Sequence, residues 1–129
     1  MPRINLQPAS ARVPAAPYIP GAKRGPFVFT AGQVGVDGEG NIAGGEGDVA
    51  AQTRQVLENV RAVLAEGGAS LGDVMKTTVY LADIRDFAAM NEVYAAFWGD
   101  DKPPRTTVEA RLANPRLLVE IEAVAVIAD

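Results

Sequence analysis

The 129-residue chain contains no cysteine and no histidine. Without cysteine it can form no disulfide, no thiol nucleophile and no thiolate metal site. Without histidine it has no imidazole general base, no Ser-His-Asp triad and no zinc site of the usual nitrogen and sulfur type. We therefore expect chemistry that uses carboxylates, Lys, Arg, Tyr, hydroxyl groups, backbone groups and water, and we predict no metal site.

Positive charge and long apolar runs are also scarce. Twelve Lys and Arg residues stand against sixteen Asp and Glu, a net charge of -4. Because nucleic-acid affinity rests on neutralising phosphates, this balance disfavours a general nucleic-acid partner. No uninterrupted apolar run is longer than Ala123 to Ala128, which is too short to span a bilayer, and no signal-peptide core follows Met1. These absences predict a soluble cytoplasmic protein with no membrane partner.

The composition that remains is that of an ordinary globular protein. Hydrophobic residues make up 48% of the chain and charged residues 22%, which argues against disorder. A chain of this length can bury a sufficient core without disulfide or metal staples. We expect one domain over residues 1–129.

Residue patterns predict the order strand, helix, strand, helix, strand, strand after a proline-rich start. Asp48 is a suitable N-cap for a long helix that ends at Gly67-Gly68, and Asp86 can cap a second helix. The predicted strands are Ile4 to Gln7, Phe27 to Val34, Met75 to Ala82, Arg105 to Ala110 and Leu118 to Ile127. This order indicates an α/β (α+β) fold, a mixed sheet with both helices on one face.

The last predicted strand has two different faces. Its apolar side is expected to take the helices and consists of Val119, Ile121, Ala123, Ala125 and Ile127. The other side mixes acids with large aliphatics: Leu118, Glu120, Glu122, Val124 and Val126. A solvated face would carry fewer aliphatic side chains, and a dry core would not carry two acids. We interpret this side as a subunit interface that contains a polar site.

Two sets of charged residues are candidates for chemistry. Glu120 and Glu122 lie on one strand face and could do acid/base work, or could be interface ion-pair partners. Arg105 shares a strand face with Thr107 and Glu109 and offers a planar fork for a carboxylate or phosphate. The alternative for Arg105 is a salt bridge to Glu109, Glu120 or Glu122.

Several segments together resemble the RidA/YjgF family of reactive-intermediate deaminases. The segments are Ala16-Pro17-Tyr18, Phe29 to Val34, Gln52 to Asn59, Lys76 to Leu81, Asp86-Phe87, Asn91-x-x-Tyr94-x-x-Phe97, Pro104 to Glu109, Arg111-Leu112 and Val119 to Ala123. The resemblance runs from about residue 13 to the end, in order and with near-normal spacing. It implies a chorismate-mutase-like fold assembled as a homotrimer, with ligand sites in the clefts between subunits. Family members hydrolyse 2-aminoacrylate and related enamines or imines to 2-keto acids and ammonia, without a cofactor.

The resemblance also implies roles for particular residues. Arg105 would hold the substrate carboxylate and Glu120 would orient or activate the attacking water. Tyr18 would close the cleft, while Gly32, beside Ala31, and the backbone at Thr107 would contact ligand or water. Phe87 and Asn91 would line the site from the neighbouring subunit.

The sequence departs from the family pattern at two of these positions. Thr107 replaces a common cysteine and Ala31 a frequent serine, which leaves open whether substrate preference or turnover is altered. The chain is also one residue shorter than usual between Glu109 and Arg111-Leu112. Aminoacrylate, other amino-acid-derived imines, aminomuconate-type dienamines and a pyrimidine-breakdown aminoacrylate all remain possible substrates.

Two other functions remain to be weighed. One is a trimer that binds small carboxylates or 2-keto acids for regulation, without turnover. The other is an endoribonuclease, an activity sometimes attached to this family. The absence of histidine, the net acidity and the lack of a basic stripe all count against the endoribonuclease.

Overall fold

A computed structural model describes residues 1–128 and shows a mixed sheet with two helices. The strands are β1 (Ile4–Leu6), β2 (Gly21–Arg24), β3 (Phe27–Thr30), β4 (Gln33–Val34), β5 (Val74–Leu81), β6 (Arg105–Glu109) and β7 (Val119–Val126). The helices are α1 (Val49–Glu66) and α2 (Phe87–Trp98), and short 3-10 turns precede β5 (Leu71–Asp73) and α2 (Ile84–Asp86).

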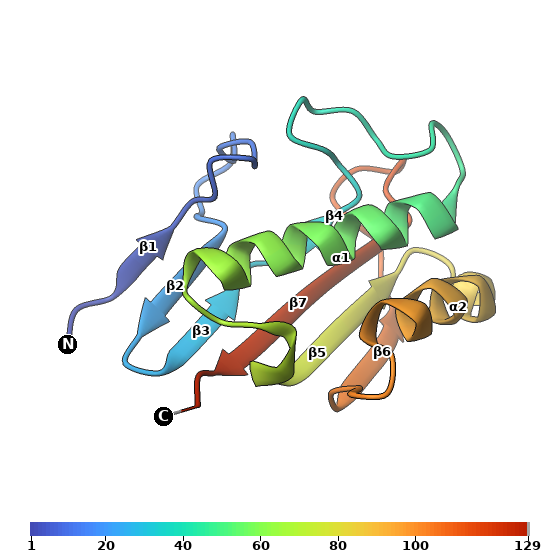
Figure 1. The fold of residues 1–129 in the computed structure, drawn as a ribbon. Helices are drawn as coiled ribbons and strands as arrows, with labels where there is room; N and C mark the ends of the chain where they lie inside the picture. The colour runs from blue at the N-terminus through green and yellow to red at the C-terminus, as the bar shows by residue number, and fades with distance from the viewer. Residues whose placement is uncertain (129) are drawn as a thin grey trace.

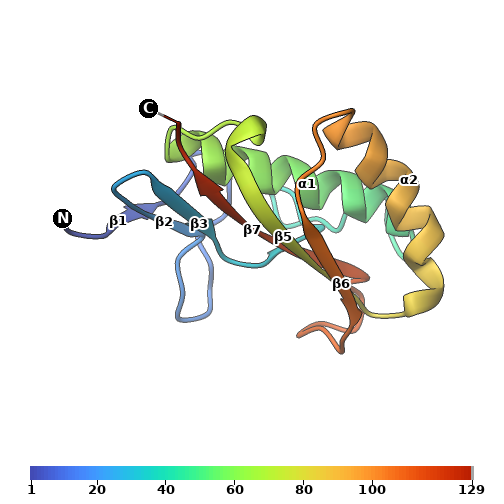
Figure 2. The same cartoon turned by 90° about the horizontal axis from the view of Figure 1, so that it is seen from below.

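The sheet has the strand order β1-β2-β3-β7-β5-β6, and β4 also pairs with β7. Neighbouring strands are antiparallel except β5 and β6, which are parallel because α2 connects them. Figures 1 and 2 show both helices on the same face of this sheet, with β6 at one edge. The α+β architecture predicted from the order of elements is therefore confirmed.

The long helix α1 begins and ends at the predicted residues. The Asp48 side chain accepts a hydrogen bond from the Ala51 N–H at 2.9 Å, and Gly67 caps the other end. One face of α1 enters the core through Val56, Leu57, Val60, Val63 and Leu64, each at most 1% exposed. The second helix also begins directly after Asp86, which is its N-cap residue as predicted, but the Asp86 side chain makes no capping bond. The side-chain cap lies one turn earlier, where Asp83 accepts from the Arg85 N–H at the start of the 3-10 turn.

The central strand β7 separates the two faces of the sheet as its alternation predicts. Val119, Ile121, Ala123 and Ala125 are at most 1% exposed, beneath the helices. Alternate residues from Leu118 to Val126 are only half-buried and point to the face without helices. The same open face carries Phe27, Phe29 and Met75, which are about half exposed. The open face is therefore unusually apolar for a surface in contact with water.

The single strand predicted over Phe27 to Val34 is wrong, because the chain breaks at Ala31-Gly32. Phe29 pairs with Val124 and Gln33 with Ile121, so this segment has one residue more than β7 between the two pairs. At this break, the Thr30 hydroxyl accepts a hydrogen bond from the Ala123 N–H at 3.0 Å. The Ala31 N–H instead donates a hydrogen bond to the carbonyl of Pro20, the residue before β2.

The prediction also missed β2, which pairs with both β1 and β3. Its sequence, Gly-Ala-Lys-Arg, contains no β-branched or aromatic residue, so it carries no local strand signal. Within residues 1–128, neither helix has the length and apolar character needed to cross a bilayer.

Candidate functional site

Arg105 lies at the start of the edge strand β6, and side chains of α2 contact its guanidinium. Its Nη1 donates a hydrogen bond to the Asn91 side-chain carbonyl at 2.7 Å. Its guanidinium carbon is 4.7 Å from the centre of the Tyr94 ring and 5.6 Å from that of Phe87. These contacts hold a half-buried cation in a defined place.

No carboxylate pairs with this cation in the described part of the chain. The ion pairs found among residues 1–128 join Arg61 to Glu58 and Arg85 to Asp83. Glu109, which shares the strand face of Arg105, instead accepts a hydrogen bond from the Ile84 N–H at 2.9 Å. The salt-bridge alternative is therefore wrong for Arg105 within its own chain, where the described residues supply no carboxylate partner.

Glu120 and Glu122 occupy the open face of β7, and their surroundings differ. Glu122 accepts a short hydrogen bond from the Tyr80 hydroxyl. This bond, followed by burial, raises the pKa of Tyr80. The half-buried Glu120 packs against Gly32, where a Cβ atom would collide with its carboxylate. Burial first, and the neighbouring charge of Glu122 second, raise the pKa of Glu120. Glu120 is therefore more ready to hold a proton than an ordinary carboxylate.

Arg105 and Glu120 point to opposite faces of the sheet. Arg105 lies opposite Thr77, which in turn pairs with Ala123 on the helix-covered face. Glu120 pairs with Tyr80 and with Val34 on the open face. Directly paired residues on neighbouring strands share a face, so one copy of the chain does not bring Arg105 and Glu120 together.

Phe87 and Asn91 lie beside Arg105 of the same chain, which corrects the expectation that they come from a neighbouring subunit. The reason is topological: α2 connects the parallel strands β5 and β6 and lies beside the edge strand, where Arg105 begins (Figure 2). The residues predicted for the site thus form two groups. The arginine group is Arg105, Asn91 and Phe87, and the glutamate group is Glu120, Gly32 and Tyr18.

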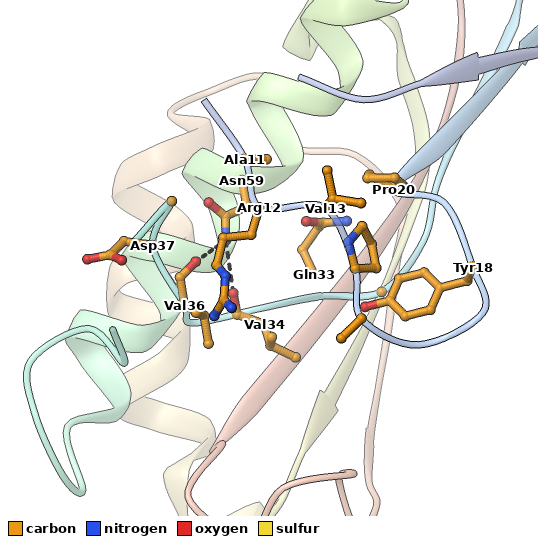
Figure 3. Close-up of a pocket in the computed structure, with 14 residues that line it drawn as sticks. Ala11, Arg12, Val13, Tyr18, Pro20, Gln33, Val34, Val36, Asp37 and Asn59 are labelled. Carbon is orange, nitrogen blue, oxygen red and sulfur yellow. Dashed lines mark hydrogen bonds between the residues drawn. The ribbon is translucent and has the colours of Figure 1, made fainter. Parts of the chain in front are cut away.

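Two members of the glutamate group, Gly32 and Tyr18, line a hollow of about 230 Å³ between the segment before β2 and β4. Figure 3 shows residues that line it, among them Val13, Pro20 and Tyr18 from the segment before β2 and Gln33 and Val34 from β4. Tyr18 is 54% exposed and therefore has room to move. Asn59 fixes the inner wall by donating to the carbonyls of Val34 and Val36, both at 2.9 Å.

Two predicted site residues have less distinctive surroundings. Thr107 shares the face of Arg105, and its hydroxyl is buried with no hydrogen-bond partner within residues 1–128. Ala31 is half-buried beside Gly32, and its carbonyl accepts from the Gln33 side chain at 3.1 Å. The structure therefore places both residues next to the two groups, Thr107 with the arginine and Ala31 with the glutamate.

Two aromatic residues at the site were not predicted as site residues. Tyr94 appears in the sequence only as part of the Asn91-x-x-Tyr94-x-x-Phe97 segment that carries the family resemblance, and its hydroxyl is a polar signal on an otherwise apolar side chain. Tyr80 lies in a local strand pattern. Such a pattern cannot reveal that the Tyr80 hydroxyl donates a hydrogen bond to Glu122 on another strand, because Glu122 is 42 positions away in the sequence.

Comparisons with known proteins agree on one family. The endoribonuclease L-PSP family model matches residues 9–127. A RutC family protein of Pyrococcus horikoshii is 50% identical over 117 residues, which cover 90% of this chain and 91% of the relative. The structure of E. coli TdcF with bound serine is similar with a TM-score of 0.88 at 36% identity, over 97% and 99% of the two chains. The E. coli YjgF gene product has a TM-score of 0.86, also at 36% identity, over 95% and 98%. The chain therefore belongs to the RidA/YjgF family, the family whose model is described as endoribonuclease L-PSP.

Proposed function

We propose that this protein hydrolyses reactive enamines and imines, such as 2-aminoacrylate and 2-iminopropionate, to 2-keto acids and ammonia. The observation that carries the proposal is the Arg105 guanidinium, which α2 holds in place without a carboxylate partner in the described chain. A 2-imino acid presents a planar carboxylate, the group that an arginine fork binds with paired hydrogen bonds.

The reaction needs few groups beyond this one. An enamine tautomerises to an imine, and a protonated imine is electrophilic enough for attack by a positioned water. Water adds to the carbon of the protonated imine while Glu120 accepts a proton from the water, which gives a carbinolamine. Glu120 then returns this proton to the amine nitrogen, and the C–N bond breaks to release ammonia as the hydroxyl gives its proton to Glu120 and the carbonyl forms. A carboxylate with a raised pKa accepts and returns a proton near neutral pH more readily than an ordinary one. Neither histidine nor cysteine is required.

The proposed site needs more than one copy of the chain. Arg105 and Glu120 face opposite sides of their own sheet, so one substrate can meet both only if they come from different copies. The open face, with Phe27, Phe29 and Met75, offers an apolar surface for such an assembly. We propose a homotrimer in which the arginine group of one subunit meets the glutamate group of the next. The hollow beside Gly32 and Tyr18 then accommodates the rest of the substrate.

The experiment that tests the proposed reaction generates imines in place. An amino-acid oxidase converts alanine to 2-iminopropionate, and semicarbazide traps the imine that has not yet been hydrolysed. We expect this protein to lower the amount of trapped imine and to speed the release of pyruvate and ammonia. An unchanged yield of trapped imine at micromolar protein would contradict the proposed function.

A second candidate function is binding of a small carboxylate without turnover. It is favoured by the related TdcF structure, which contains bound serine. Arg105 is necessary for both functions, whereas Glu120 is needed only for turnover. If the protein binds pyruvate but leaves the trapped imine unchanged, the binding function is the correct one. A parallel incubation with RNA tests the endoribonuclease description of the family model, and we expect no cleavage.

Subunit complementation tests whether the site is shared between copies. Arg105→Ala and Glu120→Ala chains are each expected to have strongly reduced activity alone and to regain activity when they are unfolded and refolded together. In a cyclic trimer of randomly mixed chains, about a quarter of the sites combine an intact Arg105 with an intact Glu120. We therefore expect roughly 25% of wild-type activity per site.

The control for complementation is the same procedure with each variant alone, and light scattering reports the assembly. No recovery in a mixture that is verified as trimeric would mean that the two residues do not serve a common site. A stable monomer at micromolar concentration would contradict the trimer itself.

A further inference from the structure

Arg105 lies over the face of an aromatic ring that belongs to the core. Tyr94 is 4% exposed, and its ring centre is 4.7 Å from the Arg105 guanidinium carbon. A cation over an aromatic face is attracted by the ring quadrupole, and more strongly when both groups are shielded from water. The Tyr94 ring therefore forms a platform for the guanidinium.

The platform is fixed to the strand beside Arg105. The Tyr94 hydroxyl and the Thr77 hydroxyl are 2.6 Å apart and form a buried hydrogen bond. Thr77 is 0% exposed and lies directly opposite Arg105 in the β5–β6 register. Burial is the main cause that raises the pKa of Tyr94, so its hydroxyl remains neutral and able to donate. The ring is thus anchored at the position that faces the backbone of Arg105.

A second contact fixes the plane of the guanidinium. Arginine has five N–H donors, and Nη1 uses one of them on the Asn91 carbonyl at 2.7 Å. The Tyr94 ring therefore contacts one face of the guanidinium, and Asn91 holds its Nη1 corner. Its Nε and Nη2 atoms donate no hydrogen bond within residues 1–128. These two atoms form one of the paired edges that suit a carboxylate.

We infer that Tyr94 is a positioning residue for ligand binding: its anchored ring holds Arg105 so that the Nε and Nη2 edge stays open to the substrate carboxylate. This inference rests on the proposed function only in that the ligand is a carboxylate. A purely structural role would be met by any apolar side chain of similar volume. Packing alone would require neither the hydrogen bond between Tyr94 and Thr77 nor the Arg105 guanidinium over the Tyr94 ring.

Three variants separate positioning from packing. Tyr94→Leu removes the platform, and Tyr94→Phe keeps the ring but removes its anchor. Phe97→Leu is the matched control, because Phe97 lies on the same helix and has Arg61 over its ring at 4.6 Å. We expect Tyr94→Leu to weaken pyruvate binding and to raise KM for 2-iminopropionate by about 2- to 30-fold. Tyr94→Phe is expected to stay within about threefold of wild type, and Phe97→Leu to bind normally.

A double-mutant cycle shows whether Tyr94 acts through Arg105. In an Arg105→Ala background, Tyr94→Leu is expected to change binding by less than about twofold, since no guanidinium is left to position. An equal loss in both backgrounds would overturn the inference. The cycle can be measured on pyruvate binding alone, so a protein that binds but hydrolyses no imine would refute the proposed reaction without deciding this inference.

A further measurement needs no ligand. Nitrogen-15 relaxation of the Arg105 Nε–H reports how well the guanidinium is ordered. We expect an ordered group in wild type and in Phe97→Leu, and increased motion in Tyr94→Leu. Equal order in the wild type and in a folded Tyr94→Leu protein would overturn the inference, whatever the protein binds.

Discussion

Replacing Arg105 by alanine is expected to lower kcat/KM for imine hydrolysis about 10- to 150-fold. A hydrogen bond to a charged group is typically worth ~1.5–3 kcal/mol, and that free energy corresponds to this range of affinity. Pyruvate binding should fall by a similar factor, because pyruvate offers the same carboxylate. Parallel measurement of imine hydrolysis and of pyruvate binding by calorimetry checks this expectation.

The controls for Arg105 test charge, geometry and fold separately. Arg105→Lys keeps the charge but loses the planar fork, so it should recover only part of the activity. Arg85→Ala makes the same change of net charge at an exposed residue that pairs with Asp83, and should be as active as wild type. Near-wild-type activity and pyruvate binding in an Arg105→Ala protein verified as trimeric would refute the role of Arg105 in binding the substrate carboxylate.

Replacing Glu120 by glutamine is expected to have opposite effects on turnover and on stability. Loss of a positioned proton acceptor costs about 100-fold or more in turnover. Pyruvate binding should change much less, because the carboxylate is held by Arg105. Glu122→Gln is the matched control, since the Glu122 carboxylate already accepts a hydrogen bond from the Tyr80 hydroxyl. Equal losses of turnover and binding in Glu120→Gln would indicate a structural acid.

The effect of Glu120 on stability follows from the direction of its pKa shift. Burial and the charge of Glu122 raise the folded-state pKa above the usual 4.5. A raised carboxyl pKa means that folding is favoured at pH values below the unfolded-state pKa. This advantage is lost as the pH rises through the folded-state pKa. At neutral pH the ionised, half-buried carboxylate therefore lowers the free energy of unfolding.

Glu120→Gln removes that ionised group and is expected to raise Tm by about 1–4 °C at pH 7. The difference from wild type should shrink toward pH 4, where both side chains are neutral. Thermal unfolding of the two proteins across this pH range checks the expectation. A destabilised Glu120→Gln protein at pH 7 would mean that the ionised carboxylate has a favourable partner in the assembled protein.

Local sequence signals were sufficient for most of the elements. The Asp48 cap, the Gly67-Gly68 stop and the spacing of Val56, Val60 and Val63 determined α1, since capping and helical periodicity are short-range properties. The alternation along β7 determined which side chains are buried. The absence of histidine and cysteine fixed the kind of chemistry that is open to the chain.

Other features depended on pairing between distant segments and could only be decided by the tertiary structure. The strand β2 exists because β1 and β3 lie on either side of it, and the break at Ala31-Gly32 arises from the register with β7. Within this register, Glu120 packs against Gly32 at a distance of 88 positions in the chain. No local pattern encodes such a contact.

The arrangement of the site shows the same division. The sequence by itself selected Arg105 and Glu120, because their residue types and motifs are visible in the linear chain. The tertiary structure decided that they face opposite sides of the sheet, since the strand register sets the direction of each side chain. It also decided that Asn91 and Tyr94 hold Arg105 in its own chain, because α2 returns beside the edge strand from which that arginine projects.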